Sequence, residues 1–243
     1  MKRIIRIAAI TIAASTLCSC KFIKINSSAL DCSAEDLFES ILSGEPVSAN
    51  GSPTQTMSYT VGGFTRVIMD GAYEMKYSTG EPSLRISAPE KVISHLVVKE
   101  EDGVLHITTD GTRIRDWGDV DAWLSAPSLN GMEINGAADF EADALVCNGE
   151  FSMEINGAGD VDIDNIQAGD IRIEVNGAGD VDLKRIRTGD VKIEVNGAGD
   201  VELGGSAVNV DIELNGTGKI DIRELVCSGN VNTRKQGIGG IRR

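Results

Sequence analysis

Carboxylate side chains recur at fixed intervals through the C-terminal half of the sequence, and such a pattern could bind cations. The motif Asn-Gly-Ala-Gly-Asp occurs in near-identical copies, and a second acid follows two residues after each copy. Hard cations such as Ca²⁺ prefer carboxylate oxygens as ligands. Like charges stacked at about 4.8 Å repel by roughly 0.9 kcal/mol per neighbour in water, which invites counter-ions. The candidate calcium ligands are Asp160, Asp162, Asp180, Asp182 and Asp200.

The same acids also fit an ordinary solvated face, which is the interpretation we favour. Arg172 and Lys192 flank the glutamates that precede each motif, and Lys184 lies close by. The calcium-binding nonapeptide Gly-Gly-x-Gly-x-Asp is not matched, because the acid falls one place away and the period differs. We therefore expect no cofactor, with calcium as the one candidate.

The residue types that enzymes use are sparse, and we predict no catalytic residue. His95 and His106 are the only histidines, and both lie outside the repeats, where a surface or satisfied role is common. No nucleophile elbow, zinc-ligand spacing or phosphate-binding loop is present. Trp117 and Trp123 could cap the fold or line a small sugar-binding spot, and packing is the role we favour.

The acids belong to a repeat of about twenty residues that begins at Met132. The glycines that follow each Asn are Gly136, Gly157, Gly177, Gly197 and Gly216, and a degenerate sixth unit follows at Gly237. The first five glycines are separated by steps of 21, 20, 20 and 19 residues. Before the repeats, from Phe64 to Ile107, short alternating segments separated by Gly, Pro, Asp and Ser predict further strands.

Each unit alternates apolar and polar residues on both sides of its glycines, which is the pattern of strands with one buried face. In one unit the apolar positions are Ile171, Ile173, Val175, Val181 and Leu183. A single unit cannot bury this face, but stacked units share a core and pair their backbones. We therefore predict an all-β fold, a parallel β-solenoid with coils of about 20 residues over residues 62–243, whose regular repeats occupy residues 132–243.

The Asn-Gly pairs are expected at a corner of each coil, because Asn and Gly tolerate the left-handed backbone conformation. Their stacked side chains would also form an amide ladder through Asn135, Asn156, Asn176, Asn196 and Asn215. In the last unit Thr233 and Lys235 replace inward apolar residues, and the chain ends in Arg242 and Arg243. Polar and basic residues there would protect the open edge of the stack.

Cys147 and Cys227 occupy equivalent positions in units that are four coils apart. At about 4.8 Å per coil their sulfurs would lie about 20 Å apart, well beyond disulfide reach. We predict two free thiols.

Residues 1–19 resemble a lipoprotein signal peptide, with a basic start and an apolar stretch too short to span a bilayer. The segment Leu17-Cys18-Ser19-Cys20 resembles the bacterial lipobox, which implies cleavage after Ser19 and lipidation of Cys20. The alternative is an ordinary cleaved signal with an accidental cysteine. By the first interpretation, the chain is attached to a membrane through Cys20.

Residues 20–61 are expected to form a tether, in which a short helix over residues 34–42 would follow the N-cap candidate Ser33. Loss of residues 1–19 removes three basic residues and lowers the formal net charge from −14 to −17. Such acidity disfavours nucleic acid and anionic lipid surfaces as partners.

Three features of the sequence resemble the head GIN domain family. They are the repeated Gly-Ala-Gly-Asp, the segment from Phe64 to Met75, and the segment Ala126–Leu129 that precedes the first repeat. That family carries the label of putative autotransporter adhesin, and the resemblance covers about residues 62–243. It implies a right-handed parallel β-helix on a lipoprotein of a Gram-negative envelope, and it supplies no catalytic or binding residue. Ala138, Thr217 and Lys219 depart from the repeated motif.

These observations predict a non-enzymatic, lipid-anchored protein of a Gram-negative cell envelope, in the outer membrane, whose β-helix presents a rigid surface for binding, adhesion or scaffolding. The residues after Cys20 lack an acidic cluster, which favours the periplasmic over the surface side. The partner would be an unknown envelope protein or a glycan. The alternatives are a carbohydrate-active enzyme or glycan-binding module on the same fold, and a Ca²⁺-dependent adhesive surface.

Overall fold

A computed structural model describes residues 46–243, whose regular secondary structure is almost entirely β-strand. The signal peptide, Cys20 and the predicted helix over residues 34–42 lie outside the described residues. The elements before the repeats are β1 (Val47–Ser48), β2 (Thr54–Tyr59), β3 (Arg66–Thr79), β4 (Ser83–Pro89), α3 (Glu90–Ile93), β5 (Leu96–Glu101), β6 (Val104–Thr109), β7 (Ile114–Asp116) and β8 (Asp121–Ala126). Among these residues, no helix has the length and apolar character needed to cross a membrane.

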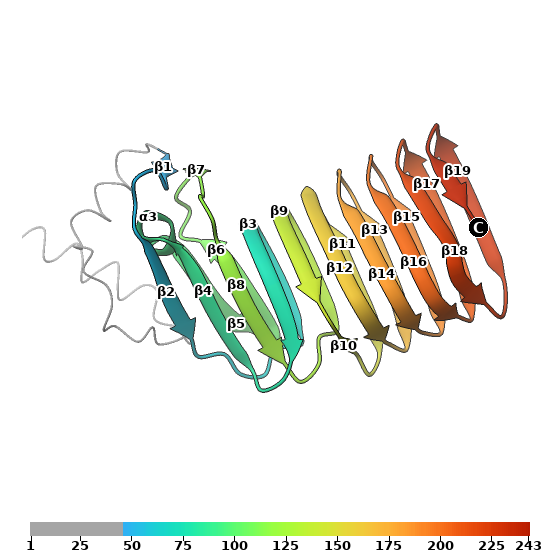
Figure 1. Ribbon diagram of the computed structural model, residues 1–243, viewed down its shortest axis with the longest axis horizontal. Coiled ribbons are helices and arrows are strands. Elements are labelled where there is room, and N and C mark those ends of the chain that lie inside the picture. The colour runs from blue at the N-terminus through green and yellow to red at the C-terminus, as the bar shows by residue number, and fades with distance from the viewer. Residues whose placement is uncertain (1–45) are drawn as a thin grey trace, which may run out of the picture.

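The repeats stack as a parallel β-solenoid, which confirms the predicted fold (Figure 1). Their strands are β9 (Gly131–Ala142), β10 (Leu145–Val146), β11 (Glu150–Ile155), β12 (Ala158–Gln167), β13 (Asp170–Val175), β14 (Asp180–Arg187), β15 (Asp190–Val195), β16 (Asp200–Ala207), β17 (Asn209–Gly216), β18 (Lys219–Cys227), β19 (Val231–Gly237) and β20 (Gly240–Arg242). Ile173 pairs with Met153 of the preceding coil and with Ile193 of the next, so the repeat register sets the strand register.

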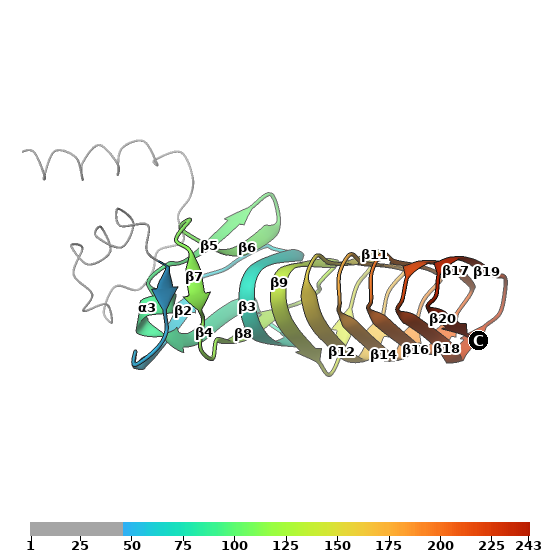
Figure 2. The same cartoon turned by 90° about the horizontal axis from the view of Figure 1, so that it is seen from above.

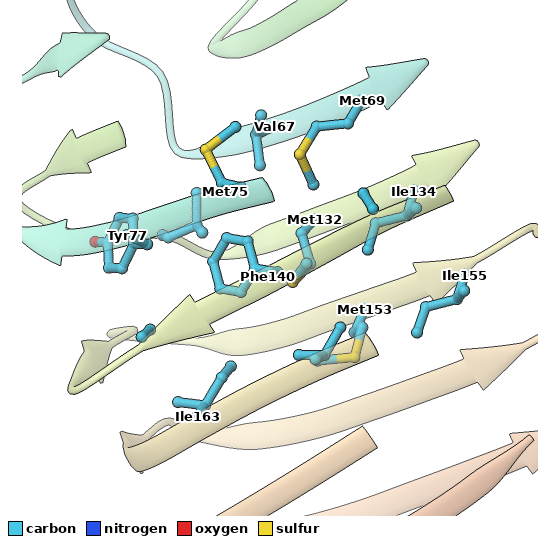
Figure 3. Close-up of a cluster of buried hydrophobic side chains, with 14 of the residues drawn as sticks. Val67, Met69, Met75, Tyr77, Met132, Ile134, Phe140, Met153, Ile155 and Ile163 are labelled. Carbon is cyan, nitrogen blue, oxygen red and sulfur yellow. The ribbon is translucent and has the colours of Figure 1, made fainter. Parts of the chain in front are cut away.

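Each coil contributes one strand before its glycine corner and one strand after it. The upstream sheet contains β11, β13, β15, β17 and β19, and the downstream sheet contains β12, β14, β16, β18 and β20. The long strands β3 and β9 run through the corner and belong to both sheets. Apolar side chains from the two sheets meet in the shared core, where Met132, Phe140 and Met153 are fully buried (Figure 3).

The stack begins one coil earlier than the first predicted unit at Met132. Strand β3 pairs in parallel with β9 without interruption from Arg66 opposite Gly131 to Tyr77 opposite Ala142. The segment Asp70-Gly71-Ala72-Tyr73-Glu74 therefore holds the positions of Asn-Gly-Ala-Gly-Asp. The sequence period conceals this unit, because residues 80–130 are inserted between β3 and β9.

The inserted residues cover the N-terminal end of the solenoid (Figure 2). Strands β6 and β8 pair in parallel with the two halves of β3, and β4 pairs antiparallel with β8. Strand β2 adds to β4, with Met57 and Tyr59 buried in the core. Part of the predicted tether over residues 20–61 thus belongs to the folded part, because β2 extends the downstream sheet.

Close stacking, and not a left-handed backbone, explains most of the corner glycines. A Cβ built on Gly177 would lie far inside van der Waals contact with the carbonyl oxygen of Gly157, and the same holds for each coil along this column. Among the described residues, Asp102 is the only non-glycine with a positive φ, so the Asn column is not left-handed. The expectation of a left-handed Asn at each corner is therefore wrong. The glycine column is explained instead by the close approach of successive coils, which leaves no room for a Cβ.

Candidate functional site

The outward side chains of the downstream sheet form two rows along the solenoid axis, and both rows are rich in acids. The first row is Glu74, Asp139, Asp160, Asp180, Asp200 and Lys219. The second row is Lys76, Glu141, Asp162, Asp182, Glu202, Asp221 and Arg242. A shallow groove of about 470 Å³ lies between the rows over β9, β12, β14 and β16. The structure thus brings all five predicted calcium ligands into one groove.

Carboxylates of the first row bind the backbone of the next coil. Asp180 Oδ1 accepts the backbone N–H of Asp200 at 3.2 Å, and Asp200 Oδ1 accepts that of Lys219 at 2.7 Å. These side chains therefore stabilise the stacking just after the corner, which reduces the number of carboxylate oxygens available to a ligand.

Cations neutralise the second row at both ends and in its middle. Lys76 Nζ lies 3.3 Å from a Glu141 oxygen, and Lys184 Nζ lies 2.8 Å from Asp162 and 3.1 Å from Asp164. The hydrogen bonds to Asp162 and Asp164 raise the pKa of Lys184 above its usual range, so this ammonium stays charged. The middle of the second row is therefore already paired with a cation of the chain itself.

Asp182 lies between the like charges of Asp162 and Glu202 in the second row. Burial raises its pKa, the negative charges of Asp162 and Glu202 add to the increase, and Lys184 opposes it from 4.0 Å. The acids stand in rows and do not converge: over residues 46–243, no group of three or more His, Cys, Asp or Glu side chains is arranged to hold a metal ion. The geometry favours mobile counter-ions along the groove over one coordinated metal.

The predicted amide ladder is present along the corner. Asn176 Nδ2 donates to Asn156 Oδ1 at 3.1 Å and to Glu174 Oε1 of its own coil at 3.1 Å. The pattern extends from Asp70, which accepts from Asn135, to Asn215. The hydrogen bond from Asn176, assisted by Arg172, lowers the pKa of Glu174. The glutamate column before the corner therefore anchors the ladder.

Three further predictions concern side chains away from the groove. Buried His95 places Nδ1 3.0 Å from Asp110 Oδ2, as expected of a satisfied histidine. Trp117 packs directly over Gly71 and meets Tyr73 edge-on at 5.6 Å, so it caps the first coil. Cys147 and Cys227 are free thiols, as their register requires.

Trp123 is not part of the core, so the packing role favoured from the sequence holds for Trp117 and is wrong for Trp123. It stands on the outer face of β8, where β4 places the guanidinium carbon of Arg85 4.1 Å from its ring centroid. Serines from four strands surround this pair: Ser58, Ser78, Ser83 and Ser125. Alternation marks each as outward-facing, but pairing between strands from distant segments, antiparallel for β2, β4 and β8 and parallel for β3, brings them together.

Solved structures of similar fold include putative adhesins from Bacteroides and Parabacteroides. A putative adhesin from Bacteroides fragilis NCTC 9343 shares 22% identity, with 81% of this chain and 99% of that chain covered and a TM-score of 0.60. A putative adhesin from Parabacteroides merdae ATCC 43184 shares 16% identity, with coverage of 82% and 98% and a TM-score of 0.53. A putative adhesin from Parabacteroides distasonis ATCC 8503 shares 14% identity, with coverage of 82% and 99% and a TM-score of 0.53.

No curated protein matches the sequence. A family model does match it, from residue 63 to residue 242, and so covers nearly all of the described structure. The match includes both the degenerate first coil in β3 and the inserted strands that cover the end of the stack. The chain belongs to the head GIN domain family, described as putative auto-transporter adhesin.

Proposed function

We propose that this protein is a non-catalytic adhesion protein of the bacterial cell envelope, which uses the outer face of its β-solenoid as a rigid binding surface. The observation that supports this most directly is the arrangement of the outward side chains, which stand in straight rows and are held by hydrogen bonds between coils. Such an arrangement orders many contact groups without conformational cost on binding. The family and the adhesin-like structures of similar fold point the same way.

An adhesion assay tests this proposal with the lipid-free mature chain, residues 20–243 with Cys20→Ser. Beads coated with the folded protein should be retained on surfaces coated with isolated envelopes or mucin, and beads coated with heat-unfolded protein should not. Equal retention of both beads would contradict the proposal. Turnover of an acidic polysaccharide, abolished by changing a single carboxylate, would instead favour a carbohydrate-active enzyme.

We also propose that Cys20 carries a lipid which holds the folded part at the outer membrane. The support is the lipobox-like sequence at the end of the apolar N-terminal segment. Metabolic labelling with a palmitate analogue should mark the wild-type chain but not Cys20→Ala. Protease treatment of whole cells then separates a periplasmic from a surface location.

Cation-dependent adhesion is a second candidate, supported by the acid-lined groove. Calcium would reduce repulsion between the rows and raise the melting temperature of the lipid-free chain. Asp160, Asp162, Asp180, Asp182 and Asp200 are the residues involved. If EDTA and millimolar Ca²⁺ leave the melting temperature unchanged relative to matched ionic strength in NaCl, this candidate is excluded.

A further inference from the structure

A second groove lies on the same outer face, at the opposite end of the downstream sheet from the last coil. It is shallow, encloses about 390 Å³ and is formed by β2, β3, β4 and β8. Its outward side chains are Ser58, Ser78, Ser83, Arg85, Trp123 and Ser125. Strand pairing sets Ser58, Arg85 and Trp123 side by side, with Lys76 next to Trp123. We call the groove formed by these outward side chains, without Lys76, the serine-tryptophan groove.

Among the described residues, the indole of Trp123 does not pack in the core and the guanidinium of Arg85 forms no ion pair. Both tryptophans are partly buried, but Trp123 lies on the outer face whereas Trp117 packs against the core. Arg85 stacks on Trp123 at 4.1 Å, and within residues 46–243 no carboxylate forms an ion pair with it. The stacking orients the planar guanidinium and leaves its N–H groups available to a ligand.

The serine hydroxyls around this pair offer both donors and acceptors. Ser125 Oγ donates to the carbonyl oxygen of Glu81 at 2.6 Å, so the 2.7 Å contact between Ser83 and Ser125 has Ser83 as the donor. Ser83 Oγ can then accept a hydrogen bond from a ligand. The hydroxyls of Ser58 and Ser78 form no hydrogen bond with any other described residue, so they can donate.

We propose that the serine-tryptophan groove binds a sugar ring of a glycan, and this inference names a ligand for the adhesive surface proposed above. The apolar face of a sugar ring packs against the exposed part of an indole, while its hydroxyls exchange hydrogen bonds with serines and a guanidinium. The volume suits a ligand of one or two sugar rings. A carboxylate on the sugar would pair with Arg85, and a neutral sugar would use the same contacts through its hydroxyls.

The glycan chain would continue along the solenoid axis. The next outward residue after Trp123 is Lys76, which is paired with Glu141 at 3.3 Å, and the acidic groove begins beyond it. A polymer with many acidic sugars would meet repulsion there. The ligand is therefore either a neutral glycan or one with an acidic sugar confined to the groove.

The test measures binding of the lipid-free mature chain to immobilised oligosaccharides. The neutral arm contains cello-, xylo- and mannohexaose, and the acidic arm contains sialyllactose, which carries a single acidic sugar. We expect saturable binding in one arm, with affinity at least about tenfold weaker in Trp123→Ala and Arg85→Gln. Lys192→Ala, an exposed change on the upstream sheet, is the matched control and should bind as the wild type does.

Arg85→Gln keeps an exposed strand position polar, so it tests the groove even if Trp123→Ala fails to fold. Absence of binding in both arms, or unchanged binding by folded Arg85→Gln and Trp123→Ala, would overturn the inference. The bead assay keeps the two proposals separate. Retention of Trp123→Ala beads at the wild-type level would leave adhesion standing and reject the groove, whereas glycan binding without bead retention would do the opposite.

Discussion

Arg223 Nη2 lies 2.7 Å from Asp221 Oδ2, and this ion pair closes the second acidic row beside the last coil. Only 8% of the Asp221 side chain is exposed, and Lys219 Nζ approaches the same oxygen at 3.5 Å. Asp182 lies two coils earlier in the same row, with like charges as its neighbours. Two aspartates in one row therefore have opposite electrostatic environments, and opposite effects on stability follow.

Replacement of Asp221 should destabilise the protein at neutral pH. Hydrogen bonding from Arg223 holds the pKa of Asp221 well below its usual range. A depressed folded-state pKa contributes stability above the unfolded-state value of about 3.9, and this stability is lost as pH falls toward the folded-state pKa. We expect Asp221→Asn to lose about 1.5–3 kcal/mol at pH 7 in urea unfolding. The difference from wild type should shrink below about pH 4.

The exposed Asp119 provides the control, because it has no hydrogen bond or ion pair with another described residue. Asp119→Asn should unfold as the wild type does at both pH values. An Asp221→Asn deficit that persists unchanged to pH 3 would show that the ion pair is not its source.

Replacement of Asp182 should have the opposite sign. Because burial and the neighbouring acids raise its folded-state pKa, Asp182 costs stability when ionised, and this cost disappears as pH falls below the unfolded-state value of about 3.9. We expect Asp182→Asn to raise the free energy of unfolding at pH 7 by less than about 1 kcal/mol, since the side chain is half exposed. Added NaCl should reduce the gain, and a lower melting temperature for Asp182→Asn at low salt would refute this account.

The corner glycines should tolerate no methyl group. A Cβ on Gly177 would collide with the carbonyl oxygen of Gly157, so Gly177→Ala must push two coils apart. We expect a loss of about 1–3 kcal/mol or more, measured by thermal or urea unfolding. Gly149→Ala is the matched control, because a Cβ there meets no atom within 4 Å. Equal stability of the two variants would contradict close stacking as the reason for the glycine column.

The amide ladder should contribute to stability through its interior members. Asn196 Nδ2 donates to Asn176 Oδ1 at 2.9 Å, and Asn196 Oδ1 accepts from Asn215 at 2.9 Å. Asn196→Ala removes both of these and the hydrogen bond from Asn196 Nδ2 to Glu194 Oε1, and should cost about 1–3 kcal/mol. Asn148→Ala makes the same change at an exposed position whose side chain bonds to no other described residue. If the melting temperatures of the two variants agree, the ladder contributes nothing beyond local propensity.

Prediction from sequence succeeded wherever one short pattern repeats. The alternation around Ile173 identifies the buried face, and the spacing of the Asn-Gly pairs defines the register in which the coils stack. The free thiols and the asparagine ladder follow from that register alone. The prediction of a left-handed corner failed. The positions at which only glycine fits depend on the distances between the backbones of successive coils, which the repeat pattern does not show.

The sequence by itself determined the solenoid, its acidic rows and its polar last coil, because parallel in-register stacking converts a period along the chain directly into columns in space. Only the tertiary structure decided how the other end is built. Trp117 covers Gly71, and Arg85 meets Trp123, through pairings between distant and non-repeating segments. No local periodicity encodes such pairings, since they depend on which strands share the inserted region. The acidic rows can thus be predicted from the sequence, whereas the serine-tryptophan groove is formed only when the chain folds.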